Sequence, residues 1–160
     1  MAYESDPITS KLNELVASQE LYFGLSDFDN LNPGERALAG TWELANEVYN
    51  GGFLQYFHNG SGEHAASMVG VLRSIEAPVA AGILEQAMEL AGPGTRWGDE
   101  RNYLKVVREM PTDIQDRLSE LARAFFDQSD DLHLQLFRYL AKHRQNIEAP
   151  DDFWTEASVQ

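Results

Sequence analysis

Three side chains near the middle of the chain have the chemistry of metal ligands. His58, Glu63 and His64 lie close together, and histidine and glutamate are both zinc ligands. Their spacing lacks the i, i+4 pair that puts two ligands on one helical face, and no fourth candidate lies nearby. The chain has no cysteine, which excludes thiolate sites, disulfides and cysteine nucleophiles. We therefore interpret these residues as solvated or helix-capping side chains.

A glycine-rich run overlaps these residues and fits part of a nucleotide-binding motif. Residues 60–65 match the pattern G-x-G-x-x-A just before an expected helix. That pattern binds a dinucleotide when it follows a β-strand, whereas here an aromatic helical turn precedes it. Ser61 lacks the G-x-S-x-G frame of a hydrolase nucleophile and suits a helix cap. The sequence therefore predicts a non-catalytic protein with no cofactor and no metal.

Acidic side chains dominate the charge of the chain. Twenty-six Asp and Glu residues against twelve Lys and Arg residues give a formal net charge of −14. Such a field disfavours direct binding to nucleic acid or to anionic lipid, and it attracts basic proteins. Plain solubility is the alternative explanation of the same excess.

One group of acids shares a face of an expected helix that begins at Thr112. At about 100° per residue these acids fall within about 60° of one another, opposite an apolar stripe. They span about 21 Å, over which duplex DNA carries about twelve charges, so four acids alone cannot imitate a duplex. The acids are Asp113, Asp116, Glu120 and Asp127, and the apolar residues are Ile114, Leu118, Leu121 and Phe125.

Two further pairs of acids could stand beside this group. Glu43 and Glu47 lie four residues apart on the expected outer side of another helix, and Asp130 and Asp131 begin the last helix. A second subunit that joined its own acids would supply the same charge, so a homodimer is a further expectation. We predict that these eight acids form the surface that binds a partner.

The stretch from Glu47 to Glu63 organises the rest of the chain. Asn50-Gly51-Gly52 should end a helix, because Asn and Gly accept the left-handed conformation of a helix C-cap. Three aromatic residues then stand at i, i+3 and i+4, on one face of a helical turn. They are Phe53, Tyr56 and Phe57. We expect a buried aromatic plug that fixes how two long helices cross; a binding loop is the alternative.

The other periodic segments also have the helical period, and most begin with a cap. Helices are expected to begin at Asp6-Pro7, Asn32-Pro33, Ser61, Ala77-Pro78, Asp99, Thr112 (with Gln115 completing a capping box) and Ser129. No stretch alternates with period two. The sequence therefore predicts an all-α, single-domain bundle of roughly seven helices over residues 1–160, closed by a short acidic tail at 148–160.

Neither end of the chain nor its interior has the pattern of a membrane protein. The opening lacks the basic and then apolar residues of a signal peptide, and no apolar run approaches the ~20 residues of a membrane span. We expect a cytoplasmic protein.

The central motif resembles the DNA-mimic-protein-like family, a group of small all-helical bacterial proteins. The motif residues that carry the resemblance are Glu47, Asn50, Gly51, Gly52, Phe53, Gln55, Tyr56, Phe57, Asn59 and Gly62. Leu72, Ile75 and Ala77 match the end of the family's next helix, and the likeness covers about residues 35–145. Gly60 departs from the family, which commonly has a serine there. The resemblance implies an all-helical fold and, from the member that gave the family its name, imitation of DNA.

Two functional hypotheses follow. The first is a non-catalytic, acidic interaction protein that imitates DNA and binds a basic, DNA-binding transcription regulator. The second is a small-ligand-binding or enzymatic domain with a pocket beside Asn50, Gln55 and Asn59. Contiguous surface acids favour the first, and a deep cleft on which those amides converge favours the second.

Overall fold

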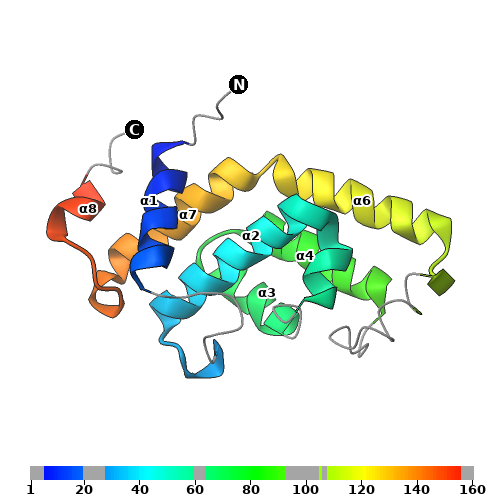
Figure 1. The fold of residues 1–160 in the computed structure, drawn as a ribbon, viewed down its shortest axis with the longest axis horizontal. Coiled ribbons are helices and arrows are strands. Elements are labelled where there is room, and N and C mark those ends of the chain that lie inside the picture. Colours follow the sequence, from blue (N-terminus) through cyan, green and yellow to red (C-terminus); the bar gives the residue numbers. More distant parts are fainter. Residues whose placement is uncertain (1–5, 20–27, 60–63, 93–104, 106–107, 156–160) are drawn as a thin grey trace.

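The computed structural model describes residues 6–19, 28–59, 64–92, 105 and 108–155. In these ranges it contains seven α-helices and no β-strand, which confirms the predicted all-α fold (Figure 1). None of the helices described is both long enough and apolar enough to cross a membrane.

The first helices begin where their caps predict. Helix α1 spans Pro7–Ser18 with Asp6 at the N-cap position, and a short 3₁₀-helix, η1, spans Phe28–Asn30. Helix α2 spans Pro33–His58 and begins with a full capping box. The Glu35 amide donates to Asn32 Oδ1 (2.8 Å), and the Asn32 amide donates to Glu35 Oε1 (3.1 Å). These two bonds satisfy amides that the helix itself leaves free.

Helices α3 (Ala65–Ser74) and α4 (Pro78–Ala91) are joined by a tight turn. The Glu76 amide donates to the Arg73 carbonyl (3.0 Å) and the Ala77 amide to the Leu72 carbonyl (2.9 Å). With Glu76 at φ 64°, this is a Schellman C-cap, and Pro78 then starts α4 as predicted. Ser61, the expected cap of α3, lies outside the described residues.

The second half of the chain follows the predicted helices with one correction, at the start of α6. Helix α6 spans Thr112–Phe126, but Pro111 holds its N-cap position without a side-chain cap bond. The predicted capping box is therefore wrong, because the Gln115 amide side chain donates to the Met110 carbonyl (3.1 Å) instead. Helix α7 spans Ser129–Lys142 and begins at Ser129 as predicted, with His143 at its C-cap. Most of the helix expected from Asp99 falls outside the described residues.

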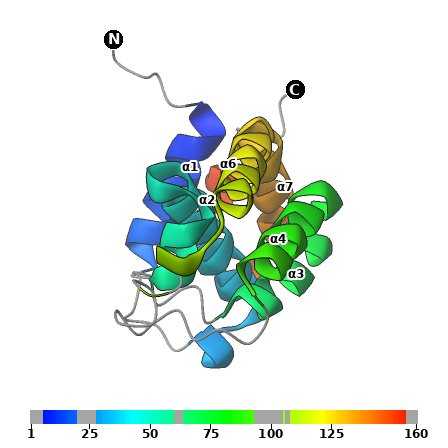
Figure 2. The ribbon, with the colours of Figure 1, turned by 90° about the vertical axis from the view of Figure 1, so that its right-hand side faces the viewer.

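The helices pack around one core. Helices α6 and α7 follow each other along one side of the molecule, and α2 packs against both (Figure 1). Helices α3 and α4 form a pair that contacts α2 and α6, respectively (Figure 2). Each of these helices contributes large side chains to the core. They include Leu38, Leu44, Met68, Leu84, Phe125 and Leu136.

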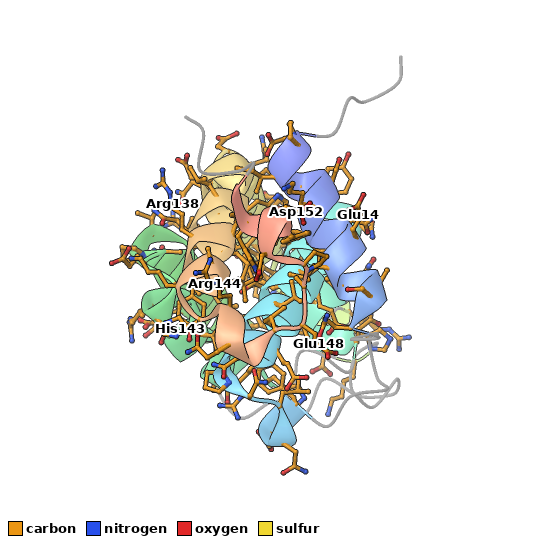
Figure 3. All side chains as sticks on the ribbon, turned by 90° about the vertical axis from the view of Figure 1, so that its left-hand side faces the viewer. Glu14, Arg138, His143, Arg144, Glu148 and Asp152 are labelled. Atoms are coloured by element: carbon orange, nitrogen blue, oxygen red, sulfur yellow. The ribbon has the colours of Figure 1, made fainter. Side chains whose placement is uncertain are left out.

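The predicted acidic tail is largely folded. After the 3₁₀-helix η3 (Arg144–Asn146), residues Asp151–Thr155 form helix α8, which lies beside α1 and α7 (Figure 3). Trp154 is 5% exposed, and its ring lies 5.5 Å from that of Phe137. Lys11 Nζ donates to the Phe153 carbonyl (2.6 Å). Phe153 and Trp154 thus attach this part of the acidic tail to α1 and α7.

Candidate functional site

A sharp bend interrupts α2 at the two glycines of the central motif. Gly51 (φ −153°, ψ 15°) and Gly52 (φ 74°, ψ −173°) leave the helical conformation, while helical hydrogen bonding resumes up to His58. Gly52 needs a left-handed φ that other residues rarely adopt. A Cβ at position 51 would lie 2.0 Å from Gln55 Oε1 and 2.8 Å from Gln55 Cβ. The predicted helix stop is thus confirmed as a break between two parts of one helix.

The aromatic residues after the bend form the predicted plug. Phe53 and Tyr56 are each 1% exposed, and Phe57 is 4% exposed. The Phe53 ring meets Phe125 of α6 edge-on at 5.8 Å and stacks at 6.1 Å on Phe57. Aromatic pairs at these distances add to the stability that burial provides. The plug therefore fixes the second part of α2 against α6.

Polar side chains hold the two parts of α2 together on another side of the bend. Gln55 Nε2 donates to Glu47 Oε2 (3.1 Å), and Asn59 Nδ2 donates to the same oxygen. On a straight helix these residues would be about 12 and 18 Å from Glu47 along the axis, so the bend brings them together. We call Glu43, Glu47, Gln55, Tyr56 and Asn59 the bend cluster. Within this cluster, Gln55 and Asn59 of the central motif are both hydrogen-bonded to Glu47.

Glu43 gives the bend cluster an unusual carboxyl group. Its Oε1 is buried and has no hydrogen-bond partner among the described residues. Burial, and then the neighbouring charge of Glu47, raise the pKa of Glu43 to about 8. The buried Tyr56 hydroxyl also lacks a partner in that part of the chain, and burial together with Glu43 raises its pKa. A carboxyl group with this pKa is mostly protonated at pH 7 and can donate a proton or a hydrogen bond.

The structure corrects the predicted position of Glu43 and Glu47. Both were expected on the outer side of α2, in the acidic surface that binds a partner. Each is only partly exposed, and Glu47 is occupied by two amide groups. The reason is the bend, which folds the second part of α2 back over the face that a straight helix would expose.

Four of the predicted acids do share an exposed face of α6. Asp113, Asp116, Glu120 and Asp127 are all exposed, and we call these four residues the acidic face. Leu118, Leu121 and Phe125 are buried on the opposite side of the helix, and Ile114 is partly buried. Two exposed arginines flank the acidic face; one of them, Arg117, approaches Glu120 with Nη1 3.9 Å from Oε2. The other is Arg123.

The first turn of α7 continues the acids beyond α6. Asp131 is exposed, while the side chain of Asp130 lies outside the described part of the structure, as does Gly62. Asp131 stands in α7, the helix that follows α6 along the chain (Figure 1). Of the eight predicted acids, four thus share one face along α6, Asp131 is exposed on α7, and Glu43 and Glu47 lie apart from them at the bend of α2.

An exposed tyrosine is a surface feature that the sequence interpretation missed. Tyr49 is 67% exposed, and its ring meets Phe126 edge-on at 5.2 Å. Val48, its neighbour, is buried, and adjacent helical residues point about 100° apart. Asn50 beside Tyr49 is also exposed.

No metal site can be built from the described side chains, which contain no group of three or more potential ligands. The His64 ring stacks on Phe28 at 4.4 Å, and Glu63 lies outside the described residues. Among the described residues, one hollow of about 390 Å³ lies between α4 and α7, and another of about 280 Å³ is lined by residues of α2, α3 and α7; neither is at the bend.

Comparison with known proteins identifies one relationship. No curated protein and no solved structure matches the chain. A family model described as DMP19-like protein matches residues 29–143, a range that contains the bend, the aromatic plug and the acidic face. The chain therefore belongs to the DMP19-like protein family.

Proposed function

We propose that this protein is a non-catalytic, acidic interaction protein that imitates DNA and occupies the DNA-binding surface of a basic regulator in the cytoplasm. The observation that carries the proposal is the exposure of all four carboxyl groups of the acidic face on one side of α6. In a chain with a net charge of −14, this face presents ordered negative charge to a basic partner.

The spacing of the charges limits how much of a duplex one chain imitates. Four acids over about 21 Å compare with about twelve DNA charges over the same length. Asp131 adds one, whereas Arg117 and Arg123 reduce the local charge. Glu43 and Glu47 are only partly exposed and lie outside the acidic face, at the bend of α2. One chain therefore suits a short section of a DNA-binding surface, and a homodimer that joins two acidic faces would cover a longer one.

The proposal is tested by competition with DNA. The partner is first recovered from a native lysate at low salt and eluted with a salt gradient. Wild-type protein should then displace operator DNA from it, because both bind one basic surface. The affinity should fall as salt rises, since exposed charges are screened within about 10 Å at 0.1 M salt.

A matched pair of variants locates the binding surface. Asp113→Asn, Asp116→Asn and Glu120→Gln together neutralise the acidic face. Glu14→Gln, Glu89→Gln and Glu148→Gln together remove the same charge from exposed positions elsewhere. The first triple variant should displace DNA much less effectively than the second. Equal displacement by both triple variants would exclude the acidic face as the surface that binds the partner. Failure of the wild type to displace DNA would exclude DNA mimicry.

A second candidate function has one observation in its favour. The protonated carboxyl of Glu43 and the hydroxyl of Tyr56 are buried, lack described partners, and could bind or protonate a small ligand at the bend. The amides of Gln55 and Asn59, which were expected to converge on such a ligand, contact Glu47 instead. A small-molecule screen by ligand-observed NMR, repeated with Glu43→Gln, tests this function: binding that Glu43→Gln leaves unchanged would rule out the site.

A further inference from the structure

Two aromatic side chains meet at the surface where α2 packs against the end of α6. Tyr49 stands two residues before the bend and is, at 67%, the most exposed large apolar side chain of the described residues. Phe126 is partly buried, and its ring meets the Tyr49 ring edge-on at 5.2 Å. We call these two residues the aromatic pair. Aromatic residues are enriched at protein–protein interfaces and often supply most of the binding energy there.

The aromatic pair adjoins the acidic face. Phe126 directly precedes Asp127, the last acid of that face, and Asp127 keeps a helical backbone conformation (φ −60°, ψ −13°). Successive helical residues point about 100° apart. Phe126 therefore stands at the border between the buried side of α6, which carries Phe125, and the acidic side, which carries Asp127. A partner that covers this end of the acidic face meets the aromatic pair as well.

The Tyr49 ring is held in place before any partner binds. Val48, the preceding residue, is 1% exposed, so this turn of α2 is fixed to the core. The edge-on contact with Phe126 restricts the Tyr49 ring further. Tyrosine has only two side-chain torsions, and a side chain that is already restricted loses little conformational freedom on binding. The aromatic pair is therefore well suited to gain affinity from a contact.

The charge beside the aromatic pair indicates what it binds. Arg123 is exposed and stands three residues before Phe126, which makes the two side chains neighbours on the surface of α6. Its positive charge opposes the approach of a lysine or arginine, which an aromatic ring would otherwise attract. The surface that fits the aromatic pair is therefore apolar and uncharged.

We propose that the aromatic pair binds an apolar patch on the partner, next to the basic surface that the acidic face occupies. The proposal rests on the proposed function in one respect, that the partner is a basic protein. The charge comparison gives the reason for such a contact: four acids stand where duplex DNA has about twelve charges. Ion pairs alone would leave this protein the weaker binder of a shared surface. Burial of apolar area adds affinity that salt does not screen.

Site-specific cross-linking tests this contact before the partner is known. Purified protein that carries p-benzoylphenylalanine at position 49 is irradiated in native lysate at low salt, and adducts are identified by mass spectrometry. Proteins that carry it at positions 14 and 89, exposed sites on α1 and α4, are the matched controls. We expect an adduct with a basic protein at position 49 alone. It should disappear when the acidic face carries its three amide substitutions.

Three results of this experiment would overturn the proposal. The first is the lack of an adduct specific to position 49, and the second is an adduct with a protein that is not basic. The third is an adduct that the three amide substitutions leave unchanged, since the aromatic pair and the acidic face would then bind different proteins.

The cross-linked protein, once purified, allows the apolar and the ionic contributions to be separated. Tyr49→Ala should weaken its binding by about thirtyfold, the effect of losing a central aromatic residue of an interface. The slope of log affinity against log salt should stay unchanged, whereas the three amide substitutions should reduce that slope. Tyr49→Phe should bind like the wild type, because it keeps the ring. Thermal unfolding checks that Tyr49→Ala is folded, and wild-type affinity of that variant would refute the contact.

This outcome is distinct from that of the DNA competition. If the wild type displaces operator DNA and Tyr49→Ala does so equally well, DNA mimicry stands and the aromatic contact fails. If Tyr49→Ala weakens binding to a basic protein from which the wild type displaces no DNA, the aromatic contact stands and DNA mimicry fails.

Discussion

The bend cluster and the acidic face place the same kind of residue in opposite environments. Glu43 and Glu47 stand on a helix that turns back on itself after Asn50, so later side chains of the same helix cover them. Asp113 and Asp116 stand on a helix that runs without interruption to Phe126 and remain exposed. The number of acids in a helix therefore says little about its surface charge until the path of the next segment is known.

This difference predicts a division of roles. Residues at the bend should determine stability, because they are buried or hydrogen-bonded within α2 and against α6. Residues of the acidic face should affect binding and leave stability almost unchanged. Substitutions in the two regions test this division, and those at the bend should change stability the most.

Phe57→Ala should lower the free energy of unfolding by about 3–5 kcal/mol, because it empties the space of a buried aromatic ring. Urea unfolding followed by circular dichroism measures the change. A variant that keeps wild-type stability but no longer binds its partner would show instead that the plug is a binding site.

Gly52→Ala should lower stability by roughly 1–3 kcal/mol, because its φ of 74° is unfavourable for any residue with a Cβ. Gly82→Ala is the matched control: it lies inside α4, and a Cβ there meets no atom within 4 Å. That substitution should raise stability by roughly 0.5–1 kcal/mol. Changes of the same sign in both variants would mean that the bend does not depend on Gly52.

Glu43 should make stability depend on pH. Its pKa in the folded protein is about 8, above the ordinary value of 4.5, so the folded state holds the proton more tightly. This contribution is fully present below pH 4.5 and is lost as the pH rises through 8. Relative to Glu43→Gln, the wild type should thus lose on the order of 1 kcal/mol between pH 5 and pH 8.

Unfolding of both proteins at several pH values measures this difference. Glu89→Gln, which alters an exposed glutamate of α4, should keep the pH dependence of the wild type. Parallel curves for the wild type and Glu43→Gln would show that Glu43 is not the titrating group.

The triple amide variant of the acidic face should have the smallest effect on the fold. Exposed substitutions usually change stability by about 0.5 kcal/mol or less, so Asp113→Asn with Asp116→Asn and Glu120→Gln should unfold like the wild type. Its complex with a basic partner should depend less on salt. A large loss of stability would show that these acids stabilise the fold, which would contradict the division of roles.

Local patterns sufficed to predict most of the fold. The capping box of Asn32 and Glu35, the Ala77-Pro78 break and the burial of Phe53, Tyr56 and Phe57 all follow from interactions within a few residues. The exposure of the acidic face followed from the helical period and its apolar opposite side.

The errors arose where segments distant in sequence meet. The sequence marked Gly51 and Gly52 as a stop but could not give the direction of the next turn, and that direction decides whether Glu47 meets Asn59 or water. The burial of Trp154 likewise depends on Phe137. Neither contact has a local pattern that would reveal it.

Helices α1 and α8, which lie at opposite ends of the described chain, contact each other. Lys11 binds the Phe153 carbonyl, and the Gln19 side chain donates to the carbonyl of Glu148 (2.6 Å), so the first and last helices described hold each other. Both lie outside residues 29–143, the range shared with the family. A short peptide link between α8 and α1 should therefore be tolerated, and a chain opened at another surface position should form a circular permutant with the same core.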